Sequence, residues 1–599
     1  MRRNPLIVKL LPVVITFGLL TSRAVAAETD AQHVPIGRQV EALTFKDIRF
    51  LPRSLNDFGE KKAFVIVAVN TTCPMVKRYV PTLKRLEEKY RDQHVQFLLL
   101  NVGAGDSLLD MAEYAVQYDI DFPVVKDDDG SCVAALGLTR TPEVAVLDGE
   151  HHLRYRGRIN DQYRIGGALP KAAHEYLSDA IDAVIQGEPV KVATTPVDGC
   201  LITPPAAVQP DETITFAEHI EPLLRKHCVG CHRDGTEAPF GLTTYEDVAA
   251  QGEMISEVVS DGRMPPRFAG HQFKEFYNLR EMSSEERELI QQWIAADMPR
   301  GSYGDKQPPP PVEPVPEGWV IGEPDLVLTM VETHHLPADG YIDYKYVTLP
   351  HVFTDDTWVQ AIQILPDNPR VVHHCNLLSL PIGGDWRKAG FITGKVPGSG
   401  PLTLADGVAQ RIPARSVLAM QIHYKSTGKE EDCKISVGFR FARGKVHKEL
   451  RHVLMKNDDF EIPPGDGNHK VTSAVTLDEA THGFGVFTHM HLRGKDMTYL
   501  AHYPDGTTET LLIIPNYSFD WQLGYRWKPH TKLFPKGTRF EVVAHFDNSA
   551  FNPFNPDPTD TVREGQQTFH EMMYGFYFYT HADEDLNMDV DVKTGHAIK

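Results

Sequence analysis

The pentapeptide C-V-G-C-H, which ends at His232, carries the most specific chemistry in this sequence. Two thiols spaced by two residues can form thioethers with the vinyl groups of a haem, and the adjacent histidine can supply an axial nitrogen to its iron. A disulfide or half of a zinc site uses the same residues, but no second cysteine pair with zinc spacing lies nearby. The pattern predicts one covalent haem c held by Cys228, Cys231 and His232.

The region around this motif resembles a cytochrome c domain, and the resemblance implies a sixth iron ligand downstream. Met264 in D-G-R-M-P-P-R is the best candidate, because the prolines restrict a loop that can present the thioether. Met254 competes with it, and a methionine that only fills the core is the remaining alternative.

Histidines form a second group, at His373 and His374 in V-V-H-H, at His423 in Q-I-H-Y, and at His489 and His491 in T-H-M-H. His489 and His491 are two residues apart in β-type sequence, so both imidazoles point to one face and can share a metal ion. Adjacent histidines diverge on a regular strand, so joint ligation by His373 and His374 requires a strand end or a distortion. Each group taken alone is also compatible with surface or satisfied core histidines.

Together with a late H-E-M-M at Met572, these patterns resemble the copper type II, ascorbate-dependent monooxygenases, the family of peptidylglycine alpha-hydroxylating and dopamine beta-monooxygenases. The resemblance covers about 270 residues. It implies two coppers, and its two ligand sets are His373, His374 and His423 for electron transfer, and His489, His491 and Met572 for oxygen activation.

The ligand types agree with copper. A thioether favours Cu(I), whereas zinc, the competing metal for any histidine site, gains little from methionine. Met573 adjoins Met572, so the identity of the thioether ligand stays open. Cys375 and Cys433 can pair as a disulfide, although the sequence does not give their separation.

Cys73 in N-T-T-C-P-M-V-K-R-Y begins a third group. The first part of the chain resembles thioredoxin-like and peroxiredoxin-like domains, in which a cis-proline, here Pro142, faces the cysteine. A helix N-terminus favours the thiolate, but Val76 stands where a C-x-x-C pair needs its second cysteine. Cys73 is therefore either a redox cysteine, resolved by Cys132, or a residue of a docking or structural module.

The chain has 599 residues, which is enough for several domains. An apolar run at 63–69, followed by helical and strand patterns in alternation, predicts an α/β sheet. Helical patterns at 216–226, 244–259 and 284–295 predict a small all-α domain, and short β-rich segments after 325 predict two all-β, jelly-roll-like sandwiches. The predicted units are a thioredoxin-like domain (33–190), a linker (191–212), a cytochrome c-like domain (213–302), a proline-rich linker (303–318), and N-terminal and C-terminal copper monooxygenase-like domains (319–455 and 456–599).

Residues 1–26 read as an export signal, with arginines before an apolar stretch and small residues at its end. No later segment is long and apolar enough to span a membrane, so we expect a periplasmic or secreted protein. The formal net charge of −20 at pH 7 disfavours nucleic acid as a partner.

The sequence thus predicts an oxidoreductase in which haem passes electrons to a copper pair that uses dioxygen to hydroxylate a C–H bond. A small-molecule or peptide substrate and an electron donor, ascorbate or a periplasmic redox protein, complete the scheme. The alternative is a non-catalytic periplasmic protein that uses the same sites for electron transfer, copper binding or redox sensing.

Overall fold

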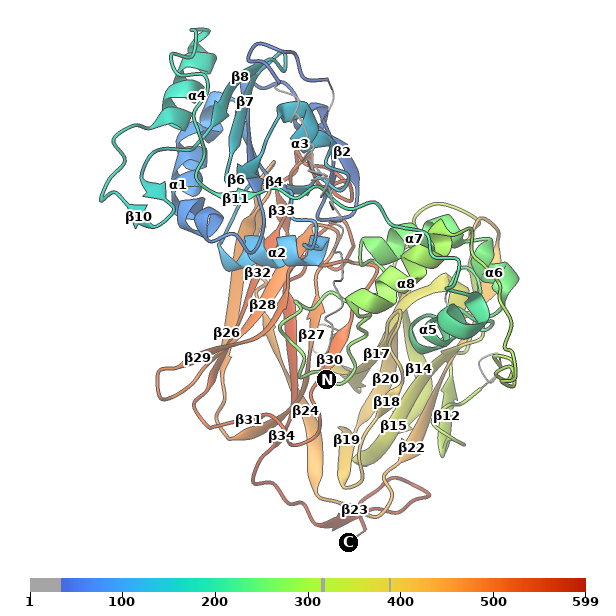
Figure 1. Cartoon of the computed structure of the whole chain (residues 1–599). Coiled ribbons are helices and arrows are strands. Elements are labelled where there is room, and N and C mark those ends of the chain that lie inside the picture. Colours follow the sequence, from blue (N-terminus) through green and yellow to red (C-terminus); the bar gives the residue numbers. More distant parts are fainter. Residues whose placement is uncertain (1–33, 42, 237, 314–317, 387–388, 599) are drawn as a thin grey trace, which may run out of the picture.

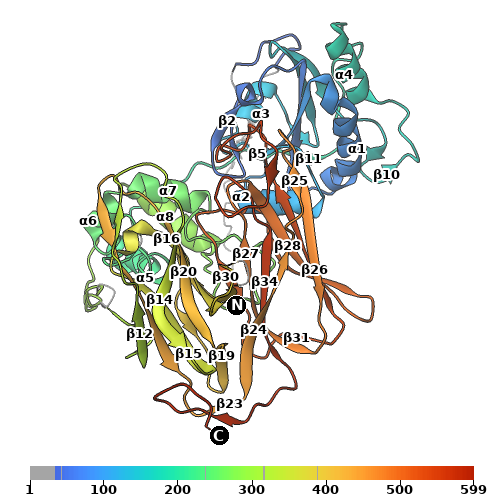
Figure 2. The same cartoon turned by 180° about the vertical axis from the view of Figure 1, so that it is seen from behind.

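The computed structural model describes residues 34–598 except 42, 237, 314–317 and 387–388. The export signal predicted at 1–26 lies outside the described residues. Figures 1 and 2 show an α/β part, a large β part, and a helical part beside the junction of the two. In the described part of the chain, no helix combines the length and apolar character needed to cross a membrane.

A seven-stranded sheet organises the α/β part, in the order β2-β1-β5-β4-β3-β7-β8. β3 (Ala63–Val69) is parallel to β4 (Val95–Asn101) and antiparallel to β7 (Val144–Asp148). Every residue of β3 is buried, as expected for a strand that is covered on both faces. The remaining strands are β1 (Thr44–Asp47), β2 (Pro52–Ser54), β5 (Val124–Lys126) and β8 (Leu153–Gly157). The helices are α1 (Pro74–Tyr90), α2 (Leu108–Gln117), α3 (Ser131–Leu136) and α4 (Tyr176–Gln186), which confirms the predicted α/β architecture.

The helical part contains α5 (Glu221–His227), which follows a π-helical turn at Phe216–Ile220, α6 (Tyr245–Ala249), α7 (Gly252–Ser260) and α8 (Ser284–Ala295). α8 begins at a capping box, in which the Ser283 side chain accepts the N–H of Glu286 and the Glu286 carboxylate accepts the N–H of Ser283. Its Trp293 lies fully buried among the other helices. The helices predicted here are present, and the one predicted at 244–259 is two helices.

One loop of this helical part belongs to another core. Phe268, Phe273 and Phe276 pack into the hydrophobic core of the last domain. The loop is also tied to that domain by backbone hydrogen bonds from Gly270 to Ile513 (3.0 Å) and from Tyr277 to Arg526 (3.0 Å). The helical part is therefore docked on the β part by buried apolar area rather than connected to it only by linkers.

Two β-sandwiches form the C-terminal half, and one long sheet runs through both. The long sheet has the order β12-β22-β15-β19-β24-β34-β27-β30, and the parallel pair β19 and β24 joins its halves. A four-stranded sheet packs on each half, β14-β20-β16-β17 in the first sandwich and β26-β32-β28-β29 in the second. The prediction that the C-terminal half is β-rich is confirmed, while its jelly-roll-like topology stays a prediction.

The strands of the first sandwich are β12 (Leu326–Thr329), β14 (Lys345–Phe353), β15 (Thr357–Pro366), β16 (Val372–Pro381), β17 (Gly390–Lys395), β19 (Val408–Ile412), β20 (Ser416–Tyr424) and β22 (Ile435–Phe441). Those of the second are β24 (Lys448–Lys456), β26 (His469–Thr476), β27 (Thr481–His489), β28 (Gly494–His502), β29 (Thr508–Ile514), β30 (Gly524–Arg526), β32 (Arg539–Phe546) and β34 (Tyr574–His581).

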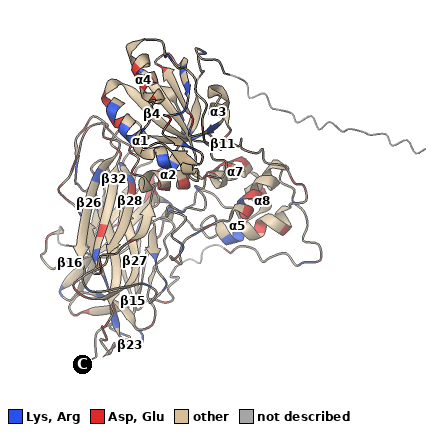
Figure 3. Ribbon diagram, turned by 60° about the vertical axis from the view of Figure 1, so that its left-hand side comes forward, with Lys and Arg blue, Asp and Glu red and all other residues tan. Residues whose placement is uncertain are grey.

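Ion pairs fix the α/β part on the other two. Arg49 Nη1 lies 2.8 Å from Asp547 Oδ2 of the second sandwich, and neither side chain is more than 8% exposed. Lys46 Nζ lies 2.7 Å from Asp261 Oδ1 of the helical part. Figure 3 shows that charges of both signs are otherwise scattered over all three parts.

Candidate functional site

His373, His374 and His423 come from two neighbouring strands of the first sandwich. His373 and His374 lie at the start of β16, and His423 lies near the end of β20. Val372 pairs with Tyr424 and His374 pairs with His423, so His373 is the extra residue of a β-bulge. A bulge breaks the side-chain alternation of a strand. The distortion that joint ligation by adjacent histidines requires is therefore present at this position.

Ring nitrogens of these three histidines face one another. Nδ1 of His373 lies 3.1 Å from Nδ1 of His374 and 3.2 Å from Nδ1 of His423. Two metal–nitrogen bonds of about 2.0 Å that meet at the metal with an N–metal–N angle of about 100° separate their nitrogens by such a distance. Burial and the neighbouring imidazoles lower the pKa of His374 well below its usual value and that of His423 to about 3. Because neutral imidazoles offer lone pairs, the three side chains fit one metal ion.

His489 and His491 form a second set at the end of β27, with ring centres 5.1 Å apart. Nδ1 of His489 lies 2.8 Å from Gln522 Oε1, and Nδ1 of His491 lies 3.2 Å from the His570 carbonyl oxygen. Both oxygens can only accept, so each Nδ1 donates a proton and each Nε2 is left for a metal. Burial lowers the pKa of His489 to about 4 and that of His491 well below its usual value.

Met572 is joined to the second set through Glu571. One oxygen of the fully buried Glu571 carboxylate accepts the N–H groups of His491 (2.8 Å) and Met572 (3.3 Å), and the other accepts the N–H of Arg493 (2.6 Å). Met573 instead packs in the core of the second sandwich. Glu571 thus ties the backbone of Met572 to that of His491, and the choice between the two predicted thioether ligands stays a prediction.

The two histidine sets meet. The ring centres of His374 and His489 are 6.2 Å apart, although one belongs to each sandwich. The ring of Phe519 contacts both sets, with its centre 5.2 Å from that of His373 and 6.0 Å from that of His491. Asp520, the next residue, places a carboxylate oxygen 3.5 Å from His373 Nε2. The segment at 519–522 thus contacts both sets.

A cavity of about 420 Å³ opens beside the second set and is shared by all three parts of the molecule. The second sandwich contributes His491 and Phe519, the α/β part contributes Phe50, and the helical part contributes Met264 and Phe268. Its volume is in the range of small-molecule sites.

The C-x-x-C-H motif begins directly after α5. Nδ1 of His232 lies 3.2 Å from the carbonyl oxygen of Phe240, so this nitrogen carries the proton and Nε2 is left for a haem iron. The Arg280 guanidinium lies 3.2 Å from Cys231 Sγ and donates to the Gly398 carbonyl of the first sandwich at 3.2 Å. His232 is thus oriented as an axial ligand of a haem iron would be. Arg280 connects the motif to the β part.

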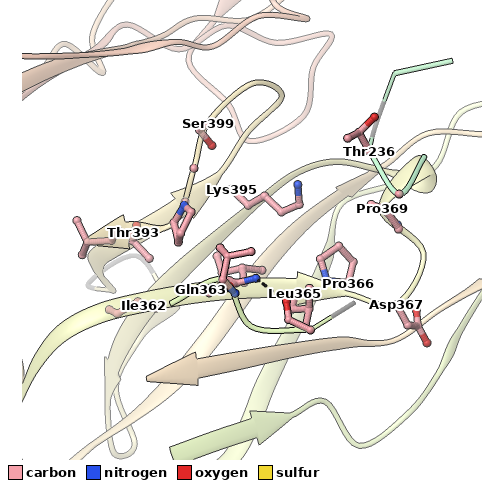
Figure 4. Close-up of a pocket in the computed structure, with 18 residues that line it drawn as sticks. Thr236, Ile362, Gln363, Leu365, Pro366, Asp367, Pro369, Thr393, Lys395 and Ser399 are labelled. Carbon is pink, nitrogen blue, oxygen red and sulfur yellow. Dashed lines mark hydrogen bonds between the residues drawn. The ribbon is translucent and has the colours of Figure 1, made fainter. Parts of the chain in front are cut away.

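A second cavity, of about 560 Å³, lies between the loop after His232 and the first sandwich (Figure 4). Lys395 extends into it between Ser399 and Thr236. Met264, the proposed sixth ligand, lines the other cavity described above, and Met254 is 48% exposed on α7. The exposure of Met254 disfavours it as a ligand.

Cys73 caps the N-terminus of α1, as expected, and its N–H donates to Asn70 Oδ1 at 2.6 Å. The Thr141–Pro142 peptide bond is cis, and Cys73 Sγ lies 3.4 Å from the Thr141 carbonyl oxygen, so the proline loop faces the cysteine as predicted. Cys132 does not face it. That thiol lies in the core on the opposite face of the sheet, 3.2 Å from the Thr44 carbonyl oxygen.

Each of the seven cysteines has a free thiol. Cys375 and Cys433 are buried in the same core of the first sandwich without a bond between them. The sequence reasoning missed Cys200, whose Sγ lies 3.0 Å from that of Cys73, and the residues that orient ligands, Gln522 and Glu571. Of these, only Glu571 had a sequence signal, its place directly before Met572.

The comparisons with known proteins concern the α/β part. Residues 47–167 match the Redoxin family model. A thiol-disulfide oxidoreductase ResA of Bacillus thuringiensis is 23% identical over 149 residues, which are 25% of this chain and 84% of that protein. Its counterpart from Geobacillus thermodenitrificans is 25% identical over 120 residues, 20% of this chain and 67% of that protein.

Solved structures also align with this chain. A hypothetical protein from Sinorhizobium meliloti is 24% identical, with a TM-score of 0.27 and coverage of 29% of this chain and 97% of that chain. The thioredoxin domain of a thiol-disulfide oxidoreductase from Bacteroides vulgatus is 14% identical, with a TM-score of 0.20 and coverage of 25% and 99%. The family match establishes a redoxin-type, thioredoxin-like domain in the N-terminal region, and this domain supports a general redox role for the chain.

Proposed function

We propose that the chain is an exported copper- and haem-dependent oxidoreductase that hydroxylates a C–H bond with dioxygen. In the overall reaction, the substrate C–H bond, dioxygen, two electrons and two protons yield an alcohol and water. Copper, when bound, supplies one-electron chemistry and dioxygen activation. A haem in the helical part supplies an electron entry point.

The convergence of five histidines from two sandwiches is the observation that carries this proposal. Three present ring nitrogens within 3.2 Å of a neighbour, and the other two have their Nδ1 protons fixed by oxygen acceptors. Five imidazoles that are buried or half-buried at one place are costly, because burying polar groups without partners is unfavourable, and a shared metal ion would supply that partner. Met572, whose N–H shares the Glu571 carboxylate with the N–H of His491, would favour copper over zinc as a ligand.

The chain's own residues account for orientation and exclusion of water. Glu571 holds the backbone of His491 and Met572 through N–H groups, and Gln522 fixes the tautomer of His489. The aromatic ring of Phe519 covers both histidine sets. The cavity beside His491 is large enough for a small molecule or the side chain of a peptide, which are the proposed substrate classes.

The proposed electron route begins at the C-x-x-C-H motif, continues through the set at His373, and ends at the set at His489. Contact of Arg280 with both Cys231 and Gly398 supports the first part of this route. The 6.2 Å separation of the His374 and His489 rings supports the second. The donor to the haem is proposed to be ascorbate or a periplasmic redox protein, in line with the export signal in the sequence.

Metal content tests the proposal first. Protein matured with haem is loaded with copper, and the copper and haem per chain are measured for wild type, His374→Ala and His489→Ala. We expect two coppers in wild type and about one in each variant, since each substitution removes a ligand from one set only. His452→Ala is the matched control, because His452 lies on β24, is half-buried like His489 and packs against Phe391 and Phe576.

Reoxidation tests the enzyme class. Fully reduced, copper-loaded protein is expected to reoxidise under dioxygen, more slowly in His489→Ala than in wild type. One copper or none, unchanged by either substitution, contradicts the metal sites. Two coppers without reoxidation by dioxygen contradicts the monooxygenase and leaves a copper-binding electron-transfer protein.

A further inference from the structure

Cys73 and Cys200 face each other, although 127 residues separate them in the chain. Their Sγ atoms are 3.0 Å apart. Cys73 lies at the N-terminus of α1, inside the region that matches the Redoxin model, whereas Cys200 lies beyond the end of that region at residue 167. The missing second cysteine of the C-x-x-C pattern is thus replaced in space by a residue from the segment predicted as a linker.

The structure holds Cys200 in place through a strand. β11 (Cys200–Leu201) pairs with β6 (Arg140–Thr141), and Cys200 stands opposite Thr141, next to the proline loop that faces Cys73. Arg140 Nη1 donates to the Gly199 carbonyl oxygen at 2.8 Å. A Cβ atom at Gly199 meets the Thr141 carbonyl oxygen at 2.0 Å, so only glycine allows this close approach.

The segment before Cys200 is also attached to the α/β part. The N–H of Arg156 donates to Ala193 and the N–H of Thr195 donates to Arg156. The hydroxyl of Thr195 lies 2.9 Å from that of Tyr155. Residues 193–201 therefore belong to the fold of the domain. Their hydrogen bonds and the strand pairing of Cys200 with Thr141 hold Cys200 beside Cys73.

The two thiols differ in accessibility and acidity. Cys73 is 2% exposed, while Cys200 is partly exposed. Burial alone raises the pKa of the Cys73 thiol, but hydrogen bonds with Thr141, with Cys200 and with the backbone of α1 outweigh it, and the net direction is down. The pKa of Cys200 is raised, first by its hydrogen bond to Cys73. Cys73 is therefore the better leaving group and Cys200 the accessible sulfur.

We propose that Cys73 and Cys200 are a reversible dithiol–disulfide pair that exchanges with small or protein thiols. In the oxidised pair, a thiolate attacks Cys200 Sγ, the bond between the two cysteines breaks, and Cys73 leaves as the thiolate. A second thiolate attacks the substrate sulfur of the mixed disulfide and releases the Cys200 thiolate. Two thiols are oxidised to one disulfide, and the Cys73–Cys200 pair takes up the two electrons and two protons.

Glutathione is the probe for the test. Full-length protein, matured with haem and kept free of copper, is equilibrated with reduced and oxidised glutathione in varied ratio, quenched by acid and alkylation, and digested for mass spectrometry. We expect a peptide that links Cys73 to Cys200 and whose yield rises with the fraction of oxidised glutathione. Cys132→Ser, the matched control on the other face of the sheet, is expected to leave this yield unchanged.

Two variants test whether the disulfide depends on Cys200 and on its position beside Cys73. Gly199→Ala is expected to lower the equilibrium constant for the linked form about tenfold, because the added methyl group displaces Cys200. Cys200→Ser is expected to abolish the linked peptide and to leave glutathione on Cys73 or no modification there. The proposal is overturned if wild-type Cys73 stays unlinked in fully oxidised glutathione or links to Cys132. This test uses the wild-type protein alone, so it holds even where a variant fails to fold.

Discussion

Replacement of Gln522 by methionine should weaken the proposed second copper site without removing any of its proposed ligands. Gln522 is 2% exposed, and its Oε1 accepts from His489 Nδ1 at 2.8 Å. Its Nε2 donates to the Phe519 carbonyl oxygen at 3.2 Å. Methionine has a similar length and no strong acceptor, so the His489 ring loses the partner that fixes both its tautomer and its rotation.

The size of the effect follows from these two hydrogen bonds. Loss of a partner that orients a ligating histidine lowers metal affinity about 10- to 100-fold, which corresponds to about 1.4 to 2.7 kcal/mol. The buried N–H of His489 and the carbonyl of Phe519 are also left without their partner, and this lowers the free energy of unfolding by about 1–3 kcal/mol. The two losses are separable, because one requires copper and the other does not.

Competition with a chromogenic Cu(I) chelator measures the affinity, and urea unfolding of the copper-free protein measures the stability. The control is Gln363→Met, since Gln363 is also buried, accepts the N–H of Val320 at 2.9 Å and donates to Gly318 at 3.2 Å, away from both histidine sets. We expect similar destabilisation in the two variants and weaker copper binding only in Gln522→Met. Unchanged affinity in Gln522→Met, or an equal loss in Gln363→Met, would refute the assigned role of Gln522.

Three further predictions follow from other contacts. Because the pKa of Cys73 is lowered, its alkylation by iodoacetamide should reach half its maximal rate at a lower pH than the value of about 8.5 typical of free cysteine, and Cys200→Ala should move this midpoint upward. The double variant Cys228→Ala, Cys231→Ala should bind haem without a covalent bond, seen as haem that acid–acetone extracts, while Cys375→Ala should release no more haem than wild type. Arg49→Met should leave the Asp547 carboxylate buried without its cation and lower the Tm, at a cost of about 3 kcal/mol. The double variant with Asp547→Asn, which removes the charge and keeps an Oδ1 acceptor for Ser549, should recover part of that loss; an unchanged Tm in the single variant excludes a role of this pair in docking.

Local patterns predicted much of the fold. The buried run at 63–69 is β3, the capping residue Ser283 starts α8, and residues 435–441 are β22. These elements follow from neighbouring residues alone, through burial on both faces, a side-chain cap or strand alternation. The need for a distortion at His373 was also local, because two adjacent side chains cannot point the same way on a regular strand.

The contacts that complete the sites depend on residues far apart in the sequence. Cys200 lies in a proline-rich stretch that resembles a spacer, and only its pairing with Thr141 brings it to Cys73. Gln522 lies in a loop with no periodicity, and its role appears only when β27 ends beside it. No pattern of spacing encodes such register between distant segments.

The arrangement of the three parts has a chemical consequence that no single part provides. The cavity beside His491 has walls from the redoxin-like domain, the helical part and the second sandwich, so an isolated sandwich pair lacks two of its sides. The aromatic residues of the 268–276 loop hold the helical part against the second sandwich, and the Arg49–Asp547 pair holds the redoxin-like domain there. Because a site that excludes water strengthens the electrostatic interactions inside it, docking of the first two parts is itself a requirement for the proposed chemistry at His489 and His491.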